Sequence, residues 1–479
     1  MTQKSTKIVA TLGPASTDRN VLTRMIAGGV DVVRMNFSHG TKEEHLARAE
    51  LVRDVSRSLE RTVGIMCDLQ GPKIRIGKFE TGRITLNNGD TFTLDADVPI
   101  GDQHQVGLDY KELPRDVAAG AVLLLDDGRL VLDVQKVQGS RITTTVRVGG
   151  VLSNNKGINR QGGGLTAPAL TAKDMEDIKT SVAMRADFLA VSFPKSGADM
   201  YMARELMRAA GGRSMLIAKM ERTEAIVAME EIIESCDGIM VARGDLAVEV
   251  GDASVPALQK RMIRAARERN KLTITATQMM ESMITSPVPT RAEVSDVANA
   301  VLDGTDAVML SAETAVGDYP VEAVEAMSRI SRAIETSSRY HDLPRVRFRE
   351  AEPTFSNATA MAAAQAAEAL GIHKIICFTE SGNTVRLLSR YRAEAEIIAL
   401  TPSERTLNGM TILSHVTPML FRQELSLEDM LHEAQALLLE RGLVLQGEEV
   451  IFVAGVPPGV SRSTNVMKLH RIGEMTRMH

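Results

Sequence analysis

Eight apolar, strand-like runs recur along the chain, and they limit its possible folds more than any other feature. They cover residues 8–13, 32–38, 63–69, 188–193, 215–221, 238–245, 272–279 and 307–314. Seven of them are followed by segments with helical periodicity, whereas the pattern changes after the third. Continuous apolar strands that alternate with helices are typical of parallel sheets buried on both faces, so eight such units predict a (β/α)8 barrel.

Nearly all of these runs end in polar or charged residues. In a barrel of this kind the carboxyl ends of the strands meet at one face and build the active site. The residues at these ends are Arg34, Asn36, Ser38, Asp68, Lys219, Glu221, Arg243, Asp245, Thr277 and Ser311. Because each buried charge needs a partner or a ligand, this ring predicts a binding site in addition to packing.

Residues 72–171 follow a period of two and contain turn signals such as Asn88-Gly89 and Asp127-Gly128. We therefore expect a small all-β domain inserted after the third strand, with the barrel formed by residues 1–71 and 172–343. An insert at this place lies on the catalytic face, which suggests a lid that excludes water. Three glycines at 162–164 are either a hinge or an ordinary surface loop.

The chain after the barrel changes character again. Residues 343–353 are rich in Pro, Arg and Glu and are typical of a linker, and residues 354–479 alternate helix-like and strand-like segments. This alternation predicts a C-terminal α/β sandwich domain.

The composition narrows the classes of protein. The 479 residues are 44% hydrophobic and 24% charged with a net charge of −5, which fits a soluble globular protein and offers no basic excess for nucleic acid. The cysteines Cys67, Cys236 and Cys377 are far apart and indicate buried apolar side chains, not a disulfide framework. We find no signal peptide and no membrane-spanning run, so we expect a cytoplasmic protein without a membrane partner.

Glu221 and Asp245 follow neighbouring strands and are expected to lie close together. Two carboxylates that leave positions open for water and substrate oxygens form a plausible Mg²⁺ site. The alternative is salt bridging of Glu221 with Arg243 or of Asp245 with Lys219, and the pair alone does not decide between them.

Further side chains at the strand ends suit an anionic ligand. Arg34 and Arg75 offer planar sets of donors to phosphate. Asn36, Ser38 and Asp68 offer oxygens to a cation.

The hydroxyls of Thr277 and Ser311 either bind a carboxylate or pass a proton, or they cap the helices that follow them. His39 lies on a loop, as a ligand contact or as a surface residue. Cations and a metal around an anionic substrate, beneath a lid, are what phosphoryl transfer and enolate chemistry require.

Several long motifs resemble those of the pyruvate kinase family. They lie at residues 9–14, 36–40, 68–75, 239–246, 276–279, 289–293 and 295–304. The likeness covers nearly the whole chain, including the order of barrel, inserted β domain, barrel and C-terminal domain. It implies transfer of a phosphoryl group from phosphoenolpyruvate to ADP, giving pyruvate and ATP, as the last step of glycolysis.

The resemblance also implies roles for the residues around the metal. Glu221 and Asp245 would bind Mg²⁺, with Mn²⁺ as a possible substitute. Lys219 would stabilise the transferring phosphoryl group and the enolate oxygen.

The substrate carboxylate would be held by amides near Gly244 and Asp245 and by the Thr277 hydroxyl. A water linked to Thr277 and Ser311 would deliver the proton that converts enolpyruvate to pyruvate. Arg34 and Arg75 would clamp phosphates.

By the same resemblance, Asn36 and His39 would lie near the nucleotide. One position departs from the pattern of many family members, which carry Glu where this chain has Lys73. Those enzymes generally require K⁺, bound by oxygens that correspond here to Asn36, Ser38, Asp68 and the Leu69 carbonyl. Because a lysine ammonium supplies a positive charge from within the protein, we predict an enzyme that does not require K⁺.

A segment of small polar residues precedes a helix in the C-terminal domain and is either a phosphate cradle or an ordinary capped helix. By resemblance it is the allosteric sugar-phosphate site, completed by residues 456–465. It comprises Thr379, Ser381, Gly382, Asn383 and Thr384. Relatives that respond to a sugar bisphosphate often carry basic residues at the positions of Glu380 and Asn383. We therefore predict activation by a sugar monophosphate or AMP, in a bacterial-type homotetramer.

Two other functions share part of this pattern. A Mg²⁺-dependent, enolate-forming barrel lyase would use the same carboxylates but gives no reason for Arg34, Arg75 and the lid. A catalytically silent sugar-phosphate sensor is the second alternative, and the intact set of Lys219, Glu221 and Asp245 argues against it.

Overall fold

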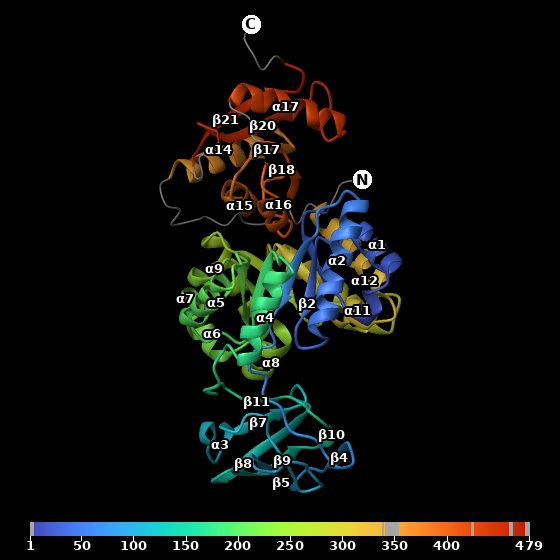
Figure 1. The fold of residues 1–479 in the computed structure, drawn as a ribbon, viewed down its shortest axis with the longest axis vertical. Helices are drawn as coiled ribbons and strands as arrows, with labels where there is room; N and C mark the ends of the chain where they lie inside the picture. The colour runs from blue at the N-terminus through green and yellow to red at the C-terminus, as the bar shows by residue number, and fades with distance from the viewer. Residues whose placement is uncertain (1–3, 338–339, 341–353, 423–425, 459–462, 475–479) are drawn as a thin grey trace.

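The structure is a computed structural model that describes residues 4–337, 340, 354–422, 426–458 and 463–474. Figure 1 shows three bodies in a row, with the barrel in the middle, the inserted β domain at one end and the C-terminal domain at the other.

Eight parallel strands close into a barrel in the order β1-β16-β15-β14-β13-β12-β3-β2, which confirms the predicted fold. They are β1 (Lys7–Thr11), β2 (Val32–Asn36), β3 (Gly64–Asp68), β12 (Phe188–Val191), β13 (Met215–Met220), β14 (Gly238–Ala242), β15 (Leu272–Ala276) and β16 (Ala307–Leu310). The helices around them are α1 (Arg19–Gly28), α2 (Lys42–Ser58), α4 (Ala172–Ala183), α5 (Gly197–Ala209), α6 (Thr223–Val227), α7 (Met229–Ser235), α8 (Arg243–Val250), α9 (Val255–Glu268), α10 (Arg291–Leu302), α11 (Ala312–Ala315) and α12 (Pro320–Glu335).

The strands are apolar on both faces because each face packs on something. Alternate residues such as Ile8, Val33 and Ile65 belong to the cluster shared with the helices, whereas Val9 and Val32 belong to the cluster inside the barrel. The interior cluster continues into residues of the C-terminal domain, so the two bodies share one apolar core.

The insert consists of a six-stranded sheet and a two-stranded sheet around its own apolar core. Its elements are β4 (Arg83–Leu86), β5 (Thr91–Asp95), β6 (Gln105–Val106), α3 (Leu113–Asp116), β7 (Val122–Leu125), β8 (Leu130–Gln138), β9 (Arg141–Val148), β10 (Gly150–Ser153) and β11 (Ile158–Arg160). The single short helix α3 is the one departure from the all-β prediction within the described residues of the insert.

The C-terminal domain holds a five-stranded sheet in the order β19-β18-β17-β20-β21, with β21 antiparallel to β20. Its elements are α14 (Phe355–Leu370), β17 (Lys374–Phe378), α15 (Asn383–Arg390), β18 (Glu396–Thr401), α16 (Glu404–Gly409), β19 (Val416–Leu420), α17 (Leu427–Glu440), β20 (Glu449–Gly455) and β21 (Thr464–Arg471). The sequence patterns missed α16, β19 and β21. The predicted linker, residues 343–353, lies outside the described residues, and the predicted domain boundaries stay predictions.

The two outer bodies contact opposite ends of the barrel. The chain enters the insert after β3, at the carboxyl ends of the strands, whereas the C-terminal domain meets the amino ends, as Figure 1 shows. There the ammonium of Lys7, at the start of β1, donates to the Val416 carbonyl over 2.7 Å. The three cysteines are free and buried. Within the described part of the chain, no helix combines the length and apolarity needed to cross a membrane.

Candidate active site

A cluster of charged side chains occupies the carboxyl ends of β2, β3 and β13. The Lys219 ammonium lies 2.9 Å from Glu221 Oε1 and 3.3 Å from Asp68 Oδ1. The other Asp68 oxygen accepts a hydrogen bond of 2.7 Å from Arg34 Nε, and Arg34 also donates to the Thr11 hydroxyl. The structure therefore joins two cations and two carboxylates into one buried network.

The charges in this network stabilise one another. Burial opposes ionisation of Asp68, but Lys219 and Arg34 outweigh it and lower the pKa of that carboxyl. Burial also acts against the charged form of Lys219, yet Asp68 and Glu221 raise the pKa of the ammonium above its ordinary value. Arg34 is 7% exposed, so its guanidinium is held in place by Asp68 and not by solvent.

The segment after β14 differs from the prediction. Arg243 and Asp245 do not end the sixth strand, because helix α8 already begins at Arg243. The Arg243 guanidinium turns away from the cluster and makes two hydrogen bonds, of 2.7 and 2.8 Å, with the Asp296 carboxylate. It also donates to the carbonyl of Thr277 over 2.8 Å. Arg243 therefore ties α8 to the end of β15 and to α10, and the proposed salt bridge with Glu221 is wrong.

Asp245 lies close enough to Glu221 to affect the ionisation of the Glu221 carboxyl. Burial, first, and the nearby Asp245 raise the pKa of Glu221 against the opposing effect of Lys219. The second alternative ion pair is also wrong, because Asp245 faces the Lys73 ammonium at 3.6 Å. Excess negative charge on two carboxylates suits a divalent cation with oxygen ligands. No group of three or more His, Cys, Asp or Glu with metal-binding geometry occurs among the described residues, so solvent or substrate would complete the coordination.

The Asn36 side-chain oxygen, which was predicted as a cation ligand at the end of β2, is hydrogen-bonded within the chain. Asn36 Oδ1 accepts a hydrogen bond of 3.1 Å from the Ser38 amide. The His39 side chain is largely exposed. Its partial burial, and then the charges of Arg75, Arg34 and Lys73, lower its pKa. The imidazole thus lies in a cationic environment, which favours its neutral form.

Thr277 and Gly244 are bonded to each other. The Gly244 amide donates to Thr277 Oγ1 over 2.8 Å, and the hydroxyl donates to the Ala276 carbonyl over 2.7 Å. Thr277 has a φ of +69°, a left-handed conformation that is rare for a β-branched residue and is found most often at functional sites.

Ser311 is the N-cap residue of α11, and its side chain makes no capping hydrogen bond to the helix. Its amide donates to Glu313 over 2.7 Å, while its Oγ is buried and has no hydrogen-bond partner among the described residues. A buried hydroxyl without a partner is available to a ligand or a water.

Lys73 and Arg75 lie on the connection that enters the insert after β3. Besides Asp245, the Lys73 ammonium lies 3.9 Å from Asp127 of the insert. Arg75 donates from its guanidinium to the Asn155 carbonyl over 3.0 Å. Lys73 therefore lies between Asp127 of the insert and Asp245 of the barrel, whereas Arg75 is held within the insert.

Both connections between barrel and insert are anchored to barrel helices. On entry, the Gly71 amide donates to Asp174 of α4 over 3.1 Å. Gly71 has a φ of +67°, and a Cβ at this position would lie 2.8 Å from the Cβ of Ser192. On exit, the Gly164 amide donates to Glu224 of α6 over 2.5 Å. The three exit glycines all have positive φ, which leaves both a hinge and a simple loop open.

Two residues at the end of β12 belong to the cluster, although the sequence patterns did not single them out. Ser192 Oγ accepts from the Lys219 ammonium over 2.8 Å and donates to the Leu69 carbonyl over 2.7 Å. The Phe193 amide, at a φ of +56°, donates to Glu221 over 2.9 Å. Their position at the end of the fourth apolar run was the signal that could have identified them.

The polar segment of the C-terminal domain forms the start of α15. Gly382 has a φ of +79° and donates from its amide to Thr379 Oγ1 over 2.9 Å. The hydroxyl of Thr384 is hydrogen-bonded to that of Thr464 on β21. Ser381 is exposed and Asn383 is half-buried. The segment therefore contacts β21 through Thr384. Residues 459–462 of the loop that was predicted to complete the site lie outside the described residues.

Comparisons with known proteins agree with this geometry. The family model described as pyruvate kinase, barrel domain, matches residues 3–324, and the one described as pyruvate kinase, alpha/beta domain, matches residues 357–470. The chain belongs to the pyruvate kinase family. Pyruvate kinase II of Salmonella typhimurium is 50% identical over 97% of this chain and 98% of its own, and the pyruvate kinase of Haemophilus influenzae is 49% identical over 94% and 96%.

The fold of this pyruvate kinase is also found among solved structures. The crystal structure of a pyruvate kinase from Cryptosporidium parvum superposes with a TM-score of 0.90 at 34% identity, covering 98% of this chain and 96% of that one. The enzyme is thus a phosphotransferase that acts on phosphoenolpyruvate and ADP and uses a divalent metal ion. This result excludes the lyase and the silent sensor as its principal function.

Proposed function

We propose that this pyruvate kinase performs phosphoryl transfer at the strand-end cluster around Lys219, as the last step of glycolysis. The supporting observation is that Asp68, Glu221 and Ser192 together hold the Lys219 ammonium charged and in one position. A fixed, buried cation stabilises negative charge that develops on the transferring group and on the enolate oxygen without reorganisation of solvent. Lys219 is therefore the principal catalytic residue.

Glu221 and Asp245 would hold Mg²⁺, or Mn²⁺ in its place. When bound, the ion neutralises charge on the substrate oxygens and orients them. The Phe193 amide fixes one Glu221 oxygen, so the carboxylate is oriented before the metal binds.

The carboxylate of phosphoenolpyruvate would lie at the start of α8, whose first turn includes Gly244 and Asp245. Backbone amides at a helix start favour an anion. The Gly244 amide donates to Thr277 Oγ1 and the Thr277 hydroxyl donates to the Ala276 carbonyl, so binding of the substrate carboxylate would exchange these hydrogen bonds for bonds to the substrate. The unpartnered Ser311 Oγ, together with Thr277, would hold the water that protonates the enolate.

Arg34, Arg75, Asn36 and His39 would bind the phosphates and the nucleotide. Arg34 belongs to the barrel network, whereas Arg75 is held by the insert. Movement of the insert toward the barrel would bring the two guanidiniums together on one ligand and exclude water. The proposed domain boundaries are residues 1–71 and 172–343 for the barrel, 72–171 for the lid and 354–479 for the C-terminal domain.

We infer that Lys73 replaces the monovalent cation, so that K⁺ is not required. Its ammonium faces Asp245 directly and contributes to the potential at His39, so its charge acts on the rim where Asn36, Ser38, Asp68 and the Leu69 carbonyl would otherwise bind K⁺. The test is ADP-dependent formation of pyruvate with Mg²⁺ in K⁺-free buffer. We expect a rate that added K⁺ leaves unchanged, and a Lys73→Glu variant that is active only with K⁺.

An absolute K⁺ requirement of the natural enzyme would overturn the role of Lys73 without affecting the assignment of the kinase reaction. Lys78→Glu is the matched control, because Lys78 is an exposed lysine on the same connection and its replacement should not create a K⁺ requirement.

We further propose that the segment of Thr379, Ser381, Gly382, Asn383 and Thr384 binds the phosphate of a monophosphate effector, a sugar phosphate or AMP, and activates the enzyme allosterically. Glu380 beside it is acidic and would repel a second phosphate. In activity assays, ribose 5-phosphate should activate at lower concentration than fructose 1,6-bisphosphate, and Asn383→Arg should reverse that order. Equal activation of the natural enzyme by the bisphosphate would contradict the assignment. The enzyme would be a cytoplasmic homotetramer. Analytical ultracentrifugation would test this oligomeric state.

A further inference from the structure

A short loop, residues 37–40, joins β2 to α2 and carries His39, the residue that the proposed function places near the nucleotide. The loop is hydrogen-bonded to the barrel on one side: the Phe37 amide donates to the Asp68 carbonyl over 3.0 Å, and the His39 amide donates to the Asn36 carbonyl over 3.2 Å. The carbonyls of Phe37 and His39 instead contact side chains of two barrel helices. The conformation of the loop therefore depends on those side chains.

His45, in the first turn of α2, contacts most of this loop. The imidazole is 3% exposed, and its Nε2 lies 2.8 Å from the His39 carbonyl oxygen. Its ring packs edge to face on that of Phe37, with the centroids 4.8 Å apart. Gly40 has a φ of +80°, and a Cβ there would lie 3.3 Å from His45 Nε2. One side chain thus touches three successive parts of the loop.

The hydrogen bond to His39 determines how the His45 imidazole is protonated. A carbonyl oxygen only accepts hydrogen bonds, so Nε2 carries the proton and donates it. Nδ1 is buried and has no hydrogen-bond partner among the residues that the structure describes. Burial lowers the pKa of His45, although the bond to the His39 carbonyl acts in the opposite direction. The imidazole is therefore neutral, and the His39 carbonyl is the hydrogen-bond acceptor that orients it.

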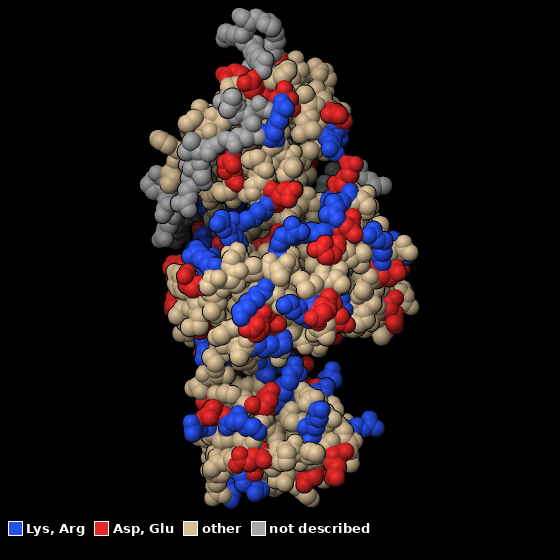
Figure 2. Space-filling view, in the orientation of Figure 1, with Lys and Arg blue, Asp and Glu red and all other residues tan. Residues whose placement is uncertain are grey.

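Lys173 of α4 is the second support of the loop. Its ammonium donates to the Phe37 carbonyl over 2.7 Å and also pairs with Asp177 on the same helix. Figure 1 shows α4 and α2 on the same side of the barrel, and the two helices contact each other. Figure 2, drawn from that side, shows acidic and basic side chains intermixed over this region. The loop is therefore held by specific hydrogen bonds and not by a patch of one charge.

We propose that His45 is a positioning residue for ADP, which fixes residues 37–40 through the His39 carbonyl in the conformation that binds the nucleotide. Lys173 supports the same conformation from α4. A loop that is already held in its binding conformation loses less conformational freedom when the ligand arrives, so its affinity is higher. The inference rests on the proposed position of the nucleotide beside Asn36 and His39.

The contacts of His45 predict an effect on one substrate only. The groups proposed to bind phosphoenolpyruvate, such as Lys219 and Thr277, lie on β13 and after β15, on other strands of the barrel. No hydrogen bond or ring contact joins His45 to these groups within the described part of the chain. Loss of the support should therefore weaken the use of ADP and spare that of phosphoenolpyruvate.

The test compares kcat/KM for each substrate in variants of the full-length enzyme. His45→Leu removes the donor at similar volume, whereas His45→Gln restores it, because the glutamine amide nitrogen reaches the position of Nε2. Lys173→Met removes the second support. Lys179→Met is the matched control, since Lys179 is exposed on the same helix and pairs with Glu176. The second substrate is kept saturating in each series, and the thermal midpoint of every variant is measured.

We expect His45→Leu to lower kcat/KM for ADP by at least about fivefold, the effect of one lost hydrogen bond, while kcat/KM for phosphoenolpyruvate stays within about twofold. Lys173→Met should show the same selectivity with a smaller loss, and His45→Gln should recover most of the activity with ADP. An equal loss for both substrates, or a glutamine variant as impaired as the leucine variant, would overturn the positioning role.

His39→Ala separates this inference from the proposed function. A loss of kcat/KM for ADP in His39→Ala but not in His45→Leu would leave the nucleotide beside the loop and overturn the role of His45. An unchanged kcat/KM for ADP in His39→Ala would place the nucleotide elsewhere and overturn both.

If His45→Leu is recovered unfolded, His45→Asn takes its place. Asparagine keeps a polar amide, but its shorter side chain does not reach the His39 carbonyl. A loss for ADP in His45→Asn that His45→Gln does not show supports the proposal, and equal behaviour of the two variants contradicts it.

Discussion

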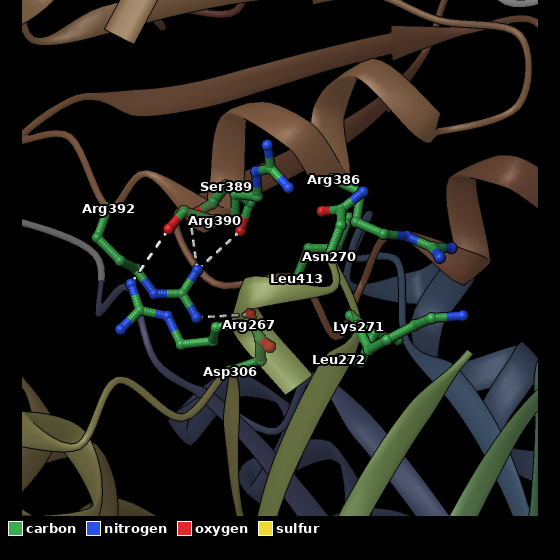
Figure 3. A pocket seen from close by; sticks show the side chains of 10 residues that line it. All are labelled: Arg267, Asn270, Lys271, Leu272, Asp306, Arg386, Ser389, Arg390, Arg392 and Leu413. Atoms are coloured by element: carbon green, nitrogen blue, oxygen red, sulfur yellow. Dashed lines mark hydrogen bonds and ion pairs between the residues drawn. The ribbon is translucent and has the colours of Figure 1, made fainter. Parts of the chain in front are cut away.

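The two ends of the barrel handle charge in opposite ways. At the carboxyl end, Lys219 and Arg34 are each matched by a carboxylate at hydrogen-bonding distance. At the amino end, Arg392 pairs with Asp306, while Arg267 Nε and Arg386 Nε have no hydrogen-bond partner among the described residues (Figure 3). The charges at the first end neutralise one another, whereas the described residues that line the pocket at the second end, between the barrel and the C-terminal domain, include more arginines than carboxylates.

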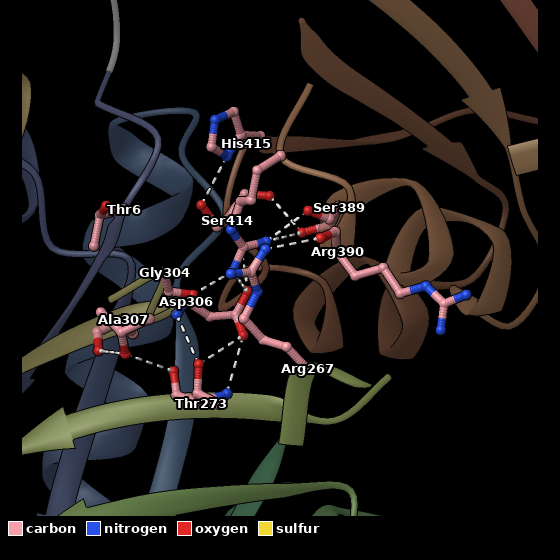
Figure 4. A network of polar contacts seen from close by, with 12 residues as sticks. Thr6, Arg267, Thr273, Gly304, Asp306, Ala307, Ser389, Arg390, Ser414 and His415 are labelled. Carbon is pink, nitrogen blue, oxygen red and sulfur yellow. Dashed lines mark hydrogen bonds and ion pairs between the residues drawn. The ribbon is translucent and has the colours of Figure 1, made fainter. Parts of the chain in front are cut away.

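This difference indicates that the charged groups at the two ends of the barrel have different roles. A balanced network holds catalytic groups in place before the substrate arrives, which is the arrangement that stabilises a transition state. Between the barrel and the C-terminal domain, by contrast, the Asp306 carboxylate pairs with Arg392 and joins the two bodies, within the polar network that Figure 4 shows. The fold thus uses buried charge to hold a site at one end and to hold two domains together at the other.

The largest effect is expected at the balanced end. Lys219→Met removes the cation that neutralises Glu221 and Asp68, and we expect turnover to fall by about 10³-fold or more. Stability should also fall, by about 3–5 kcal/mol, because two buried carboxylates lose their partner. Steady-state turnover and urea unfolding measure the two effects. Lys260→Met, at an exposed lysine, is the control, and turnover unchanged by Lys219→Met would refute the assigned role.

At the opposite end we expect a loss of stability without a comparable loss of turnover. Asp306→Asn removes the carboxylate that pairs with Arg392 at 2.8 Å, which should cost about 3 kcal/mol as a broken buried ion pair. Thermal unfolding measures this loss, and turnover at saturating substrate should change less than about tenfold, two orders of magnitude less than for Lys219→Met. Sulfate should restore part of the stability; equal stability of both proteins in chloride would show that the cations are not in excess.

A third effect concerns the link between the active-site helix α8 and the insert, and it depends on pH. Glu249 of α8 is 5% exposed, accepts from the Thr223 amide over 2.8 Å, and through its carbonyl accepts from the Gly162 amide. Burial, and then the charges of Glu224 and Asp245, raise its pKa to about 7. Since the folded chain keeps this proton to a higher pH than the unfolded chain does, the contribution is complete below pH 4.5 and is lost as the pH rises to about 7.

The shift corresponds to about 3 kcal/mol of folding free energy between these pH values. Urea unfolding from pH 5 to pH 8 should therefore show a steeper loss of stability in the natural chain than in Glu249→Gln. Glu205→Gln, at an exposed position, should keep the slope of the natural chain. Parallel curves for the natural chain and Glu249→Gln would show that the carboxyl has an ordinary pKa.

Much of the fold was predictable because it depends on short-range patterns. The apolar runs identified all eight barrel strands, and the change to a period of two identified the insert. The elements that were missed, such as α16 and β21, are short or lie at the edge of a sheet, where one exposed face weakens the apolar pattern. The beginning of α8 was placed wrongly because its first residues are as polar as the end of a strand.

The sequence by itself determined that charged residues end the strands and that Glu221, Asp245 and Lys219 share one end of the barrel, since chain direction and alternation suffice for that. Only the tertiary structure decided the partner of each charge. Arg243 pairs with Asp296, so Glu221 pairs with Lys219 instead. Ser192, which follows the fourth barrel strand in the sequence, accepts a hydrogen bond from Lys219. The pocket between the barrel and the C-terminal domain likewise arises from segments around 267, 306 and 386–392. Which charges meet depends on distances of a few ångströms across loops and bodies far apart in the chain, and no local pattern carries that information.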